Sequence, residues 1–376
     1  MRLPPARTGD EVTSRDKALP FTFWPTRKET TREKVQHTLF ATDPWYIIQD
    51  RLNGISSLPA RRQAGAFLKQ AREFYESARV ADINISRPLL LYYSFLNLVK
   101  SFIVFRAEAP ITVRLSHGLQ EQLPTTAGAV HGQLVVKYSL PNGVFKRFSD
   151  ALGQQINGVV PVTDIAVRSS DFLAQILIGH RVYCAGEGIL ERFISVDSIR
   201  YWHDVNQRTA WLTCRFDRSD ATRFGYSGTQ VGAALNRAST WRRVVSIDDE
   251  ESKKFLVFET IVTHPYAGRP ADVIGDVSLS GKFSFWRSVT SYPPYRKYYA
   301  YLSTPTQVVF HQLLSIYMAV YYFGSITRYK PEELEFIMNS RLGPFVNEFF
   351  SNQASQFLYL MASEMVEQEV TKAAIV

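Results

Sequence analysis

Residues 88–105 read PLLLYYSFLNLVKSFIVF, and the structure of this stretch decides the fold of the chain. It is apolar nearly all round, with Asn97 and Lys100 as polar interruptions. A helix that is apolar on every side is buried in a protein core or in a membrane. The stretch is at the lower length limit for crossing a bilayer and carries polar residues in its middle, so we expect a core helix. Ser86 as a cap and Pro88 in the first turn predict where it begins.

Further helices are predicted on both sides of this core helix along the chain. Asp43-Pro44 favours the start of a short helix that ends at Gly54. In residues 59–79, apolar side chains recur at spacings of three and four and therefore share one face. Residues 307–323 form a second apolar stretch that is too short and too polar in its middle to favour a membrane span. The helices predicted near the C-terminus are 306–329, 331–339 and 345–369, with a break at Gly343-Pro344.

The middle of the chain is rich in short β-type runs, which turn signals such as Pro265 and Gly268 separate. Short helices are expected at 145–152 and 171–178. The pattern predicts an α+β protein in which N- and C-terminal helices form a helical core and the central segment forms an antiparallel sheet. The predicted strands are 133–140, 211–216, 241–247, 255–262 and 282–289. The predicted segments are an N-terminal arm at 1–40, helical core at 41–130, a β-rich middle at 131–303 and helical core at 304–376.

The composition of the chain indicates its cellular compartment and the kinds of molecule that it could bind. The chain has 43 basic and 35 acidic side chains, a formal net charge of +8 and a pI near 9.3. This excess is compatible with RNA or DNA as a partner but does not require one. Cys184 and Cys214 are too few to staple a protein of this length, so we expect a reduced, cytoplasmic setting. The N-terminus has no apolar h-region typical of a signal peptide, so secretion is not expected. We expect that the protein binds a protein partner or forms a homo-oligomer, and that it does not associate with a membrane.

Several catalytic motifs are absent from the sequence. It has no Walker A motif, no GxGxxG after a strand and no HExxH, and the run 225–228 lacks the spacing of a GxSxG elbow. Residues 248–251 are four adjacent acids in a predicted turn, which is typical of a solvated loop. ATP hydrolysis, Rossmann redox chemistry and zinc hydrolysis are therefore disfavoured, and we predict neither a metal site nor a cofactor.

Several short segments share their order and spacing with bacterial YaaC-like proteins. They are FYESA at 74–78, ISRPLLLYY at 85–93, LNLVK at 96–100, LSHGL at 115–119 and NGVF with FS at 142–149, and a looser likeness is Tyr321-Tyr322-Phe323 with Arg328-Tyr329. The chain resembles this family over residues 70–150, whereas the first 40 residues and much of 160–300 lie outside the likeness. The resemblance implies a helical core in a bacterial protein and transfers no substrate or catalytic residue. The core is also similar, at fold level, to HEPN-type domains, many of which cleave RNA.

Two Arg–His pairs are candidates for the site of such a ribonuclease. Arg32 and His37 match the HEPN spacing but precede the predicted core. Arg114 and His117 lie within the family-like segment, and a His near an Arg can bind phosphate or transfer protons. Gly118 next to them permits a sharp turn. The alternative is that His117 only caps a helix or bonds to a loop.

Lys100 is the third candidate catalytic residue. Tyr93, Asn97 and Lys100 are spaced four and three apart and so share one helical face. A buried Lys needs a carboxylate, carbonyls or a ligand, unless its ammonium reaches the surface. Convergence of Lys100 with His117 would create an anion site.

Residues 281–301, GKFSFWRSVTSYPPYRKYYAY, interleave basic and aromatic side chains without an acid. This composition suits nucleic-acid binding by stacking, a protein interface, or a strand core with a Tyr-rich loop. The candidate nucleic-acid or partner-binding residues are Trp286, Arg287, Tyr295, Arg296 and Lys297.

Two hypotheses remain open at this point. One is an interaction or scaffold subunit of a bacterial multiprotein system, such as phage defence, that docks on a partner protein and binds nucleic acid. The other is a metal-independent HEPN-type ribonuclease with a degenerate site around Lys100, Arg114 and His117.

Overall fold

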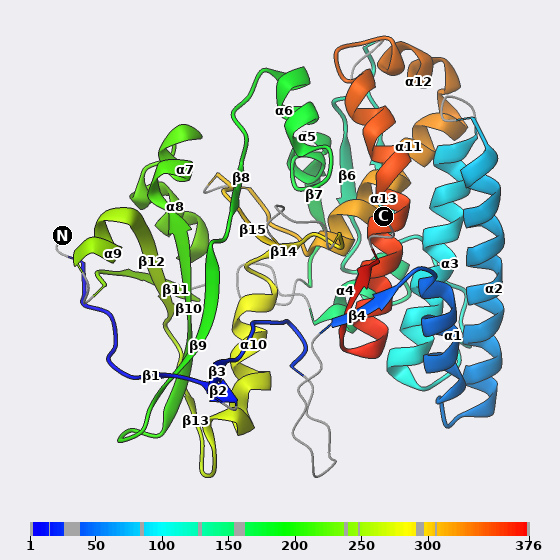
Figure 1. The fold of residues 1–376 in the computed structure, drawn as a ribbon. Coiled ribbons are helices and arrows are strands. Elements are labelled where there is room, and N and C mark those ends of the chain that lie inside the picture. The colour runs from blue at the N-terminus through cyan, green and yellow to red at the C-terminus, as the bar shows by residue number, and fades with distance from the viewer. Residues whose placement is uncertain are drawn as a thin grey trace. The chain divides into compact units, whose positions relative to one another are not determined.

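The chain forms two compact units (Figure 1). The helical unit comprises residues 43–191 and 308–366, and the sheet unit comprises residues 1–42, 192–307 and 367–376. Each unit therefore combines segments that are far apart in sequence. The computed structural model describes residues 3–14, 16–25, 38–82, 86–126, 130–153, 162–236, 240–246, 249–290, 297–304 and 307–373. The helices and the antiparallel sheets confirm the predicted α+β class.

The helical unit contains the helices that surround residues 88–105. Its helices are α1 (Pro44–Asn53), α2 (Leu58–Val80), α3 (Arg87–Ala107), α4 (Val144–Leu152), α5 (Ser169–Leu173), α6 (His180–Glu187), α11 (Gln312–Tyr329), α12 (Pro331–Met338) and α13 (Gly343–Val366). A small antiparallel sheet has the order β5 (Leu119–Gln122), β6 (Gln133–Val136) and β7 (Ile165–Arg168). The Asp43 carboxylate accepts from the Trp45 N–H at 2.9 Å, so the predicted cap of α1 is confirmed.

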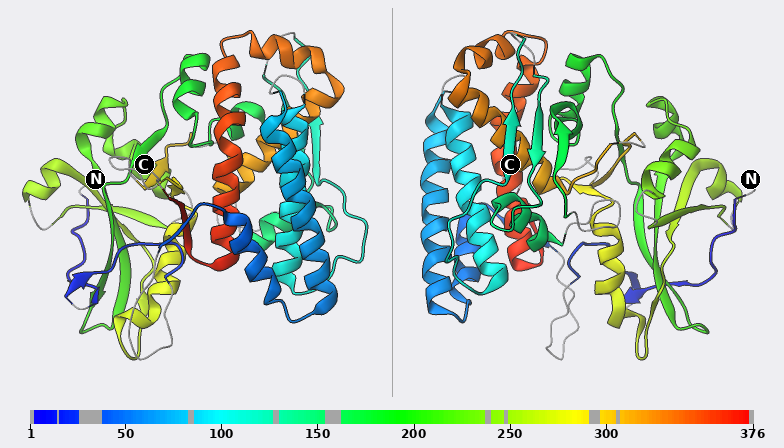
Figure 2. Two further views of the ribbon diagram at one scale, coloured as in Figure 1. Left: turned by 45° about the vertical axis from the view of Figure 1, so that its right-hand side comes forward. Right: turned by 180° about the vertical axis from the view of Figure 1, so that it is seen from behind.

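Helices α2 and α3 lie side by side and antiparallel, as Figures 1 and 2 show. The Ser94 hydroxyl of α3 donates to the carbonyl of Ala71 at 2.8 Å, and the Ser101 hydroxyl donates to the carbonyl of Ala64 at 2.9 Å. Both alanines are fully buried. Their small side chains allow the two backbones to approach closely enough for these bonds.

Helix α3 is the central helix of this unit. Phe95 stacks on Phe357 of α13 with ring centroids 3.9 Å apart. A Cβ added at Gly324 of α11 would lie 3.2 Å from the Cβ of Tyr92, so α11 also packs tightly on α3. Among the described helices, only α3 is long and apolar enough to cross a membrane, and 72% of its apolar window is buried inside the protein. This packing confirms the predicted core helix.

Two helices of this unit differ from their predicted bounds. Helix α5 is shorter than the predicted 171–178, and α11 begins at Gln312 rather than at 306. The side-chain amide of Gln175 donates to the carbonyl of Val308 at 2.7 Å and accepts from the N–H of Phe310 at 2.8 Å. These backbone groups of Val308 and Phe310 therefore bond to a side chain that is distant in sequence, and they do not join the first turn of α11.

The sheet unit is built from short strands and short helices. Its strands are β1 (Asp10–Glu11), β2 (Thr13–Ser14), β3 (Lys17–Ala18), β4 (Thr38–Ala41), β8 (Phe193–Ser195), β9 (Ser198–Asp204), β10 (Thr209–Asp217), β11 (Trp241–Val244), β12 (Phe255–Thr260), β13 (His264–Pro265), β14 (Trp286–Arg287), β15 (Tyr298–Tyr301) and β16 (Glu369–Lys372). Its helices are α7 (Arg218–Arg223), α8 (Gly228–Leu235), α9 (Asp249–Lys254), the 3-10 helix η2 (Pro270–Val273) and α10 (Ile274–Lys282).

The main sheet is antiparallel and has the strand order β1-β9-β10-β12-β11, with β13 also paired to β10. Leu212, Cys214 and Phe216 alternate along β10 and belong to the same hydrophobic core as Ile274 and Val277 of α10. The strands predicted at 211–216, 255–262 and 241–247 correspond to β10, β12 and β11, which are neighbours in this sheet with β11 at its edge. Three smaller sheets of this unit pair β14-β15-β8 and β2-β3 antiparallel and β16-β4 in parallel.

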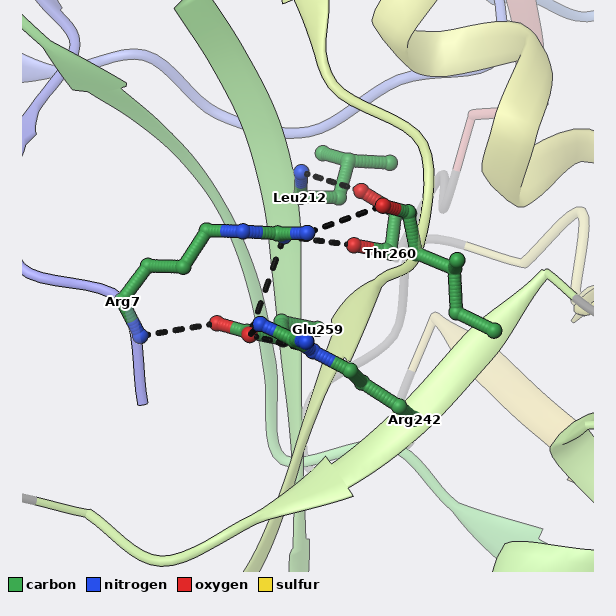
Figure 3. A network of polar contacts seen from close by, with 6 residues as sticks. Arg7, Leu212, Arg242, Glu259 and Thr260 are labelled. Carbon is green, nitrogen blue, oxygen red and sulfur yellow. Dashed lines mark hydrogen bonds and ion pairs between the residues drawn. The ribbon is translucent and has the colours of Figure 1, made fainter. Parts of the chain in front are cut away.

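The N-terminal segment is fastened to the main sheet. The Arg7 guanidinium donates to the carbonyls of Thr260 at 2.6 Å and Ile261 at 2.8 Å, and its backbone N–H donates to Glu259 Oε2 at 3.1 Å (Figure 3). Arg242 of β11 donates from Nε to Glu259 Oε1 at 2.8 Å. The Glu259 side chain is buried, and two arginines therefore compensate one buried carboxylate.

The strand predicted at 282–289 is largely wrong. Helix α10 extends to Lys282, and β14 contains only Trp286 and Arg287. Gly281 lies within α10, where an added Cβ would come 3.0 Å from the Phe21 ring. The glycine is required for close packing and not for a break in the chain.

Candidate anion-binding site

The candidate site lies within the helical unit, where α3, α11 and the loop before β5 meet. Tyr92 and Lys100 are eight residues apart on α3 and lie along one row of the helix. Tyr321 and Arg328 are seven residues apart on α11 and likewise share a face. His117 comes from the loop, and its ring centroid lies 5.7 Å from that of Tyr92 and 5.9 Å from that of Tyr321.

The loop that carries His117 is held against the start of α4. The Ser116 N–H donates to the carbonyl of Asn142 at 3.1 Å, and the His117 carbonyl accepts from the Phe145 N–H at 3.2 Å. Gly118 has a φ of +74°, and an added Cβ would lie 3.0 Å from the Cα of Gly143. The turn predicted at Gly118 is thus present, and it fixes the position of the preceding histidine.

Tyr92 orients the imidazole of His117 through a short hydrogen bond between its hydroxyl and Nδ1. Burial, supported by the neighbouring Tyr93, raises the pKa of Tyr92 far above its ordinary value. The phenol therefore keeps its proton and can donate it to Nδ1. This assignment leaves the imidazole proton on Nε2.

The His117 side chain is solvent-accessible and electrostatically coupled to two cations. Partial burial lowers the pKa of His117, and the Lys100 ammonium and the Arg328 guanidinium lower that pKa further, whereas Glu121 raises it. Lys100 and Arg328 therefore each act electrostatically on His117. A direct contact of Lys100 with His117 around a bound anion stays a prediction.

Neither of the two cations has a carboxylate partner within the part of the chain that the structure describes. The Lys100 ammonium lies 5.5 Å from the Phe67 ring centroid, and burial lowers its pKa. Arg328 is exposed, with its guanidinium carbon 5.0 Å from the Tyr329 ring centroid. A half-buried ammonium without a counterion is costly, and a bound anion would remove that cost.

Glu121 of β5 is the acidic residue of the site. Its carboxylate accepts a short hydrogen bond from the Tyr321 hydroxyl, whose oxygen also lies 3.0 Å from the carbonyl oxygen of Leu119. With a neutral imidazole, Lys100, Arg328 and Glu121 leave one net positive charge. The site is therefore suited to a monoanionic group such as a phosphodiester.

The structure does not bring Arg114 to this site. Arg114 lies in an exposed loop, and its side chain forms no hydrogen bond or ion pair with any residue in the described ranges. Arg328, and not Arg114, is the arginine that acts electrostatically on His117 among the described residues. Tyr92, Glu121, Tyr321 and Arg328 were not predicted as site residues, although the looser family likeness included Tyr321 and Arg328.

Three of the candidate binding residues of 281–301, namely Trp286, Arg287 and Lys297, are described within the sheet unit, and the two of them in β14 face its interior. Trp286 is 3% and Arg287 0% exposed, and Arg287 donates to the carbonyl of Val370 at 3.2 Å. Lys297 forms a short ion pair with the buried carboxylate of Glu369. Of the three interpretations of this segment, the buried strand core is the one that fits Trp286 and Arg287. Neither of these two residues therefore presents its side chain to a ligand. Tyr295 and Arg296, like the Arg32–His37 pair, lie outside the described residues.

Within the described residues, no three His, Cys, Asp or Glu side chains are grouped so as to hold a metal ion. Nε2 of His180 and Sγ of Cys184 lie 3.3 Å apart. Both side chains are buried within the helical unit. The pair is therefore part of the core packing and is closed to a substrate.

The fold defines an α+β protein whose helical unit gathers Lys100, His117 and Arg328 around two buried tyrosines. The chain belongs to the YaaC-like protein family, whose model matches residues 28–365. This match extends well beyond the 70–150 over which the likeness was recognised, and it includes all the residues of the site. No curated protein and no solved structure matches the chain.

Proposed function

We propose that this protein is a non-enzymatic binding subunit of a bacterial multiprotein system, and that its helical unit holds a phosphate group of a nucleic acid between Lys100, His117 and Arg328. The observation that carries the proposal is the pairing of two cations that lack carboxylate partners with an accessible imidazole. The basic balance of the whole chain, +8, supports an anionic ligand.

Each of the three groups contributes differently to phosphate binding. Arg328 offers a planar set of donors that matches phosphate oxygens, and Lys100 offers a point charge. His117 donates its Nε2 proton, because Tyr92 occupies Nδ1. None of these contacts reads a base, so the site holds the backbone of a nucleic acid without selecting a sequence.

Binding of fluorescent oligonucleotides by anisotropy tests the proposal. Lys100→Ala and Arg328→Gln should each weaken binding. Each should also reduce the slope of log K against log salt concentration by the amount that corresponds to about one phosphate contact. Arg72→Gln is a matched control, because the Arg72 guanidinium also lies over an exposed tyrosine, Tyr46, but is paired with Asp43 at 3.1 Å. Unchanged affinity and salt slope in both site variants would refute the proposal.

The second candidate function is a metal-independent ribonuclease, and a specific observation favours it. The lowered pKa of His117 keeps the imidazole neutral near pH 7, as a general base requires, and two cations flank it. The protein should be incubated with labelled RNA in EDTA beside the His117→Ala variant. Cleavage that persists in EDTA and disappears in the variant would replace the binding role with a catalytic one.

A further inference from the structure

Tyr329, the last residue of α11, is an exposed aromatic side chain beside the phosphate site. It is 56% exposed, and its ring centroid lies 5.0 Å from the guanidinium carbon of Arg328. An exposed tyrosine covered on one side by an arginine leaves ring surface for a second planar group. Single exposed aromatics are common, so its significance depends on what lies next to it.

Arg328 connects Tyr329 to the other groups of the site. The Arg328 guanidinium lowers the pKa of His117 and also acts on the Tyr92 hydroxyl, so it lies in electrostatic range of both. Arg328 lies seven residues after Tyr321 on the same face of α11, and the Tyr321 ring centroid is 5.9 Å from that of His117. The Tyr329 ring therefore lies beside one of the three groups proposed to hold the phosphate.

The end of α11 is also firmly placed. The Lys330 ammonium donates to the carbonyl of Pro124 at 2.6 Å, and the Lys330 N–H donates to the carbonyl of Ile326 at 2.8 Å. Pro331 then begins α12. The backbone that carries Tyr329 is thus held between two helices, so binding of a base needs little further ordering of the backbone.

From this juxtaposition of an exposed ring with the cationic site, we infer that the ligand is single-stranded nucleic acid and that one unpaired base stacks on Tyr329. The inference rests on the proposed phosphate site and adds the strandedness of the ligand to it. In a duplex the bases are stacked on each other and their faces are inaccessible to a side chain, whereas a single strand can present a base face. Arg328 would then lie between phosphate and base, bound to the first and stacked beside the second.

The test compares a single-stranded oligonucleotide with a duplex of the same length and sequence by anisotropy. Tyr329→Ala should weaken single-strand binding by about 5- to 100-fold, the range that loss of one base–aromatic stack produces, whereas Tyr329→Phe should retain it. The duplex should bind more weakly than the single strand and should be insensitive to Tyr329→Ala. Tyr46→Ala is the matched control, because Tyr46 is 65% exposed and lies 4.9 Å from the Arg72 guanidinium carbon, but that arginine is paired with Asp43.

The outcomes separate this inference from the proposed function. Loss of binding in Lys100→Ala with unchanged binding in Tyr329→Ala would overturn the stacking inference and leave the phosphate site intact. Duplex binding as tight as single-strand binding would also overturn it. Unchanged binding in Lys100→Ala and Arg328→Gln would instead overturn the phosphate site on which the inference rests.

Discussion

The hydroxyl of Tyr92 on α3 is hydrogen-bonded to Nδ1 of His117, a residue 25 positions further along the chain. The contact joins the core helix to the loop before β5. Because Tyr92 is only 5% exposed and is packed against α11, the position of the accessible imidazole is set by a buried residue. An accessible functional group that is positioned from the core is a common arrangement in binding sites.

Replacement of Tyr92 by Phe should free the imidazole without disrupting the core. The ring packing is retained, so we expect a loss of about 0.5–1.5 kcal/mol in the free energy of unfolding, the contribution of one hydrogen bond. The His117 ring should change from a single tautomer to a mixture, which ¹⁵N NMR of the imidazole would report. A tautomer unchanged from that of the parent protein would contradict the assignment of Tyr92 as the donor.

The affinity for nucleic acid should rise as the pH falls below 6.5, the ordinary pKa of histidine. In the free protein the pKa of His117 is lowered, so the imidazole is neutral near pH 7; a bound phosphate favours the imidazolium and raises that pKa. Each pKa unit of this increase is worth about tenfold in affinity at acidic pH. The dependence should vanish in His117→Ala and persist in His131→Ala. The same lowered pKa makes the ligand-free protein less stable below pH 6.5, because the unfolded chain takes up the proton more readily.

Glu121→Gln should tighten phosphate binding. The substitution removes the carboxylate that raises the pKa of His117, while the Tyr321 hydroxyl can still donate to the carbonyl of Leu119. Because Glu121 raises the pKa of His117, its loss also lowers that pKa, and the comparison is clearest at pH 8, where the imidazole is neutral in both proteins. We expect a gain of about 2- to 10-fold, the effect of one partly screened charge. Weaker binding at pH 8 would mean that Glu121 contacts the ligand favourably.

The sequence predicted the elements of the helical unit because their signals are local. The all-round apolar pattern of 88–105, the Asp43 cap and the turn at Gly118 each act within a few residues, and each is present. Lys100 and His117 could be singled out in the same way. Arg328 could not, because its electrostatic action on His117 depends on the packing of α11 on α3 at Gly324, which a pattern confined to one helix does not encode.

For the segment 281–301, in contrast, the local sequence signal was misleading. Its basic and aromatic composition is that of a binding surface, yet Arg287 is fully buried and Lys297 is paired with Glu369. Glu369 is 72 positions further along the chain, in β16, which pairs with β4. The carboxylate that pairs with a basic side chain can thus lie far away in sequence. A basic segment without acidic residues of its own is therefore not necessarily available to bind an anionic ligand.

Gly118→Ala should destabilise the helical unit and weaken nucleic-acid binding. A side chain at a φ of +74° is strained, and the new Cβ would also press on Gly143. Gly153→Ala is a matched control, with a φ of +70° but no atom within 4 Å of the added Cβ. We expect about 1–2 kcal/mol of lost stability from the backbone in both variants and a further loss only at Gly118. Equal losses in urea unfolding would show that the contact with Gly143 is unimportant.

The buried carboxylate of Glu259 should make Arg7 and Arg242 interdependent. Each arginine alone can compensate the charge, so Arg7→Ala and Arg242→Ala should each cost about 1–3 kcal/mol, the loss of hydrogen bonds to a charged group. The double variant leaves the carboxylate unpaired, and its loss should exceed the sum of the single losses by about 1–3 kcal/mol. Arg200→Ala is the control on the same sheet, because the Arg200–Glu11 pair at 3.1 Å is partly exposed and should contribute less than about 1 kcal/mol. Urea unfolding of the four variants measures these losses in the free energy of unfolding. Additive losses would mean that Arg7 stabilises the sheet only through the carbonyls of Thr260 and Ile261, and not through the charge of Glu259.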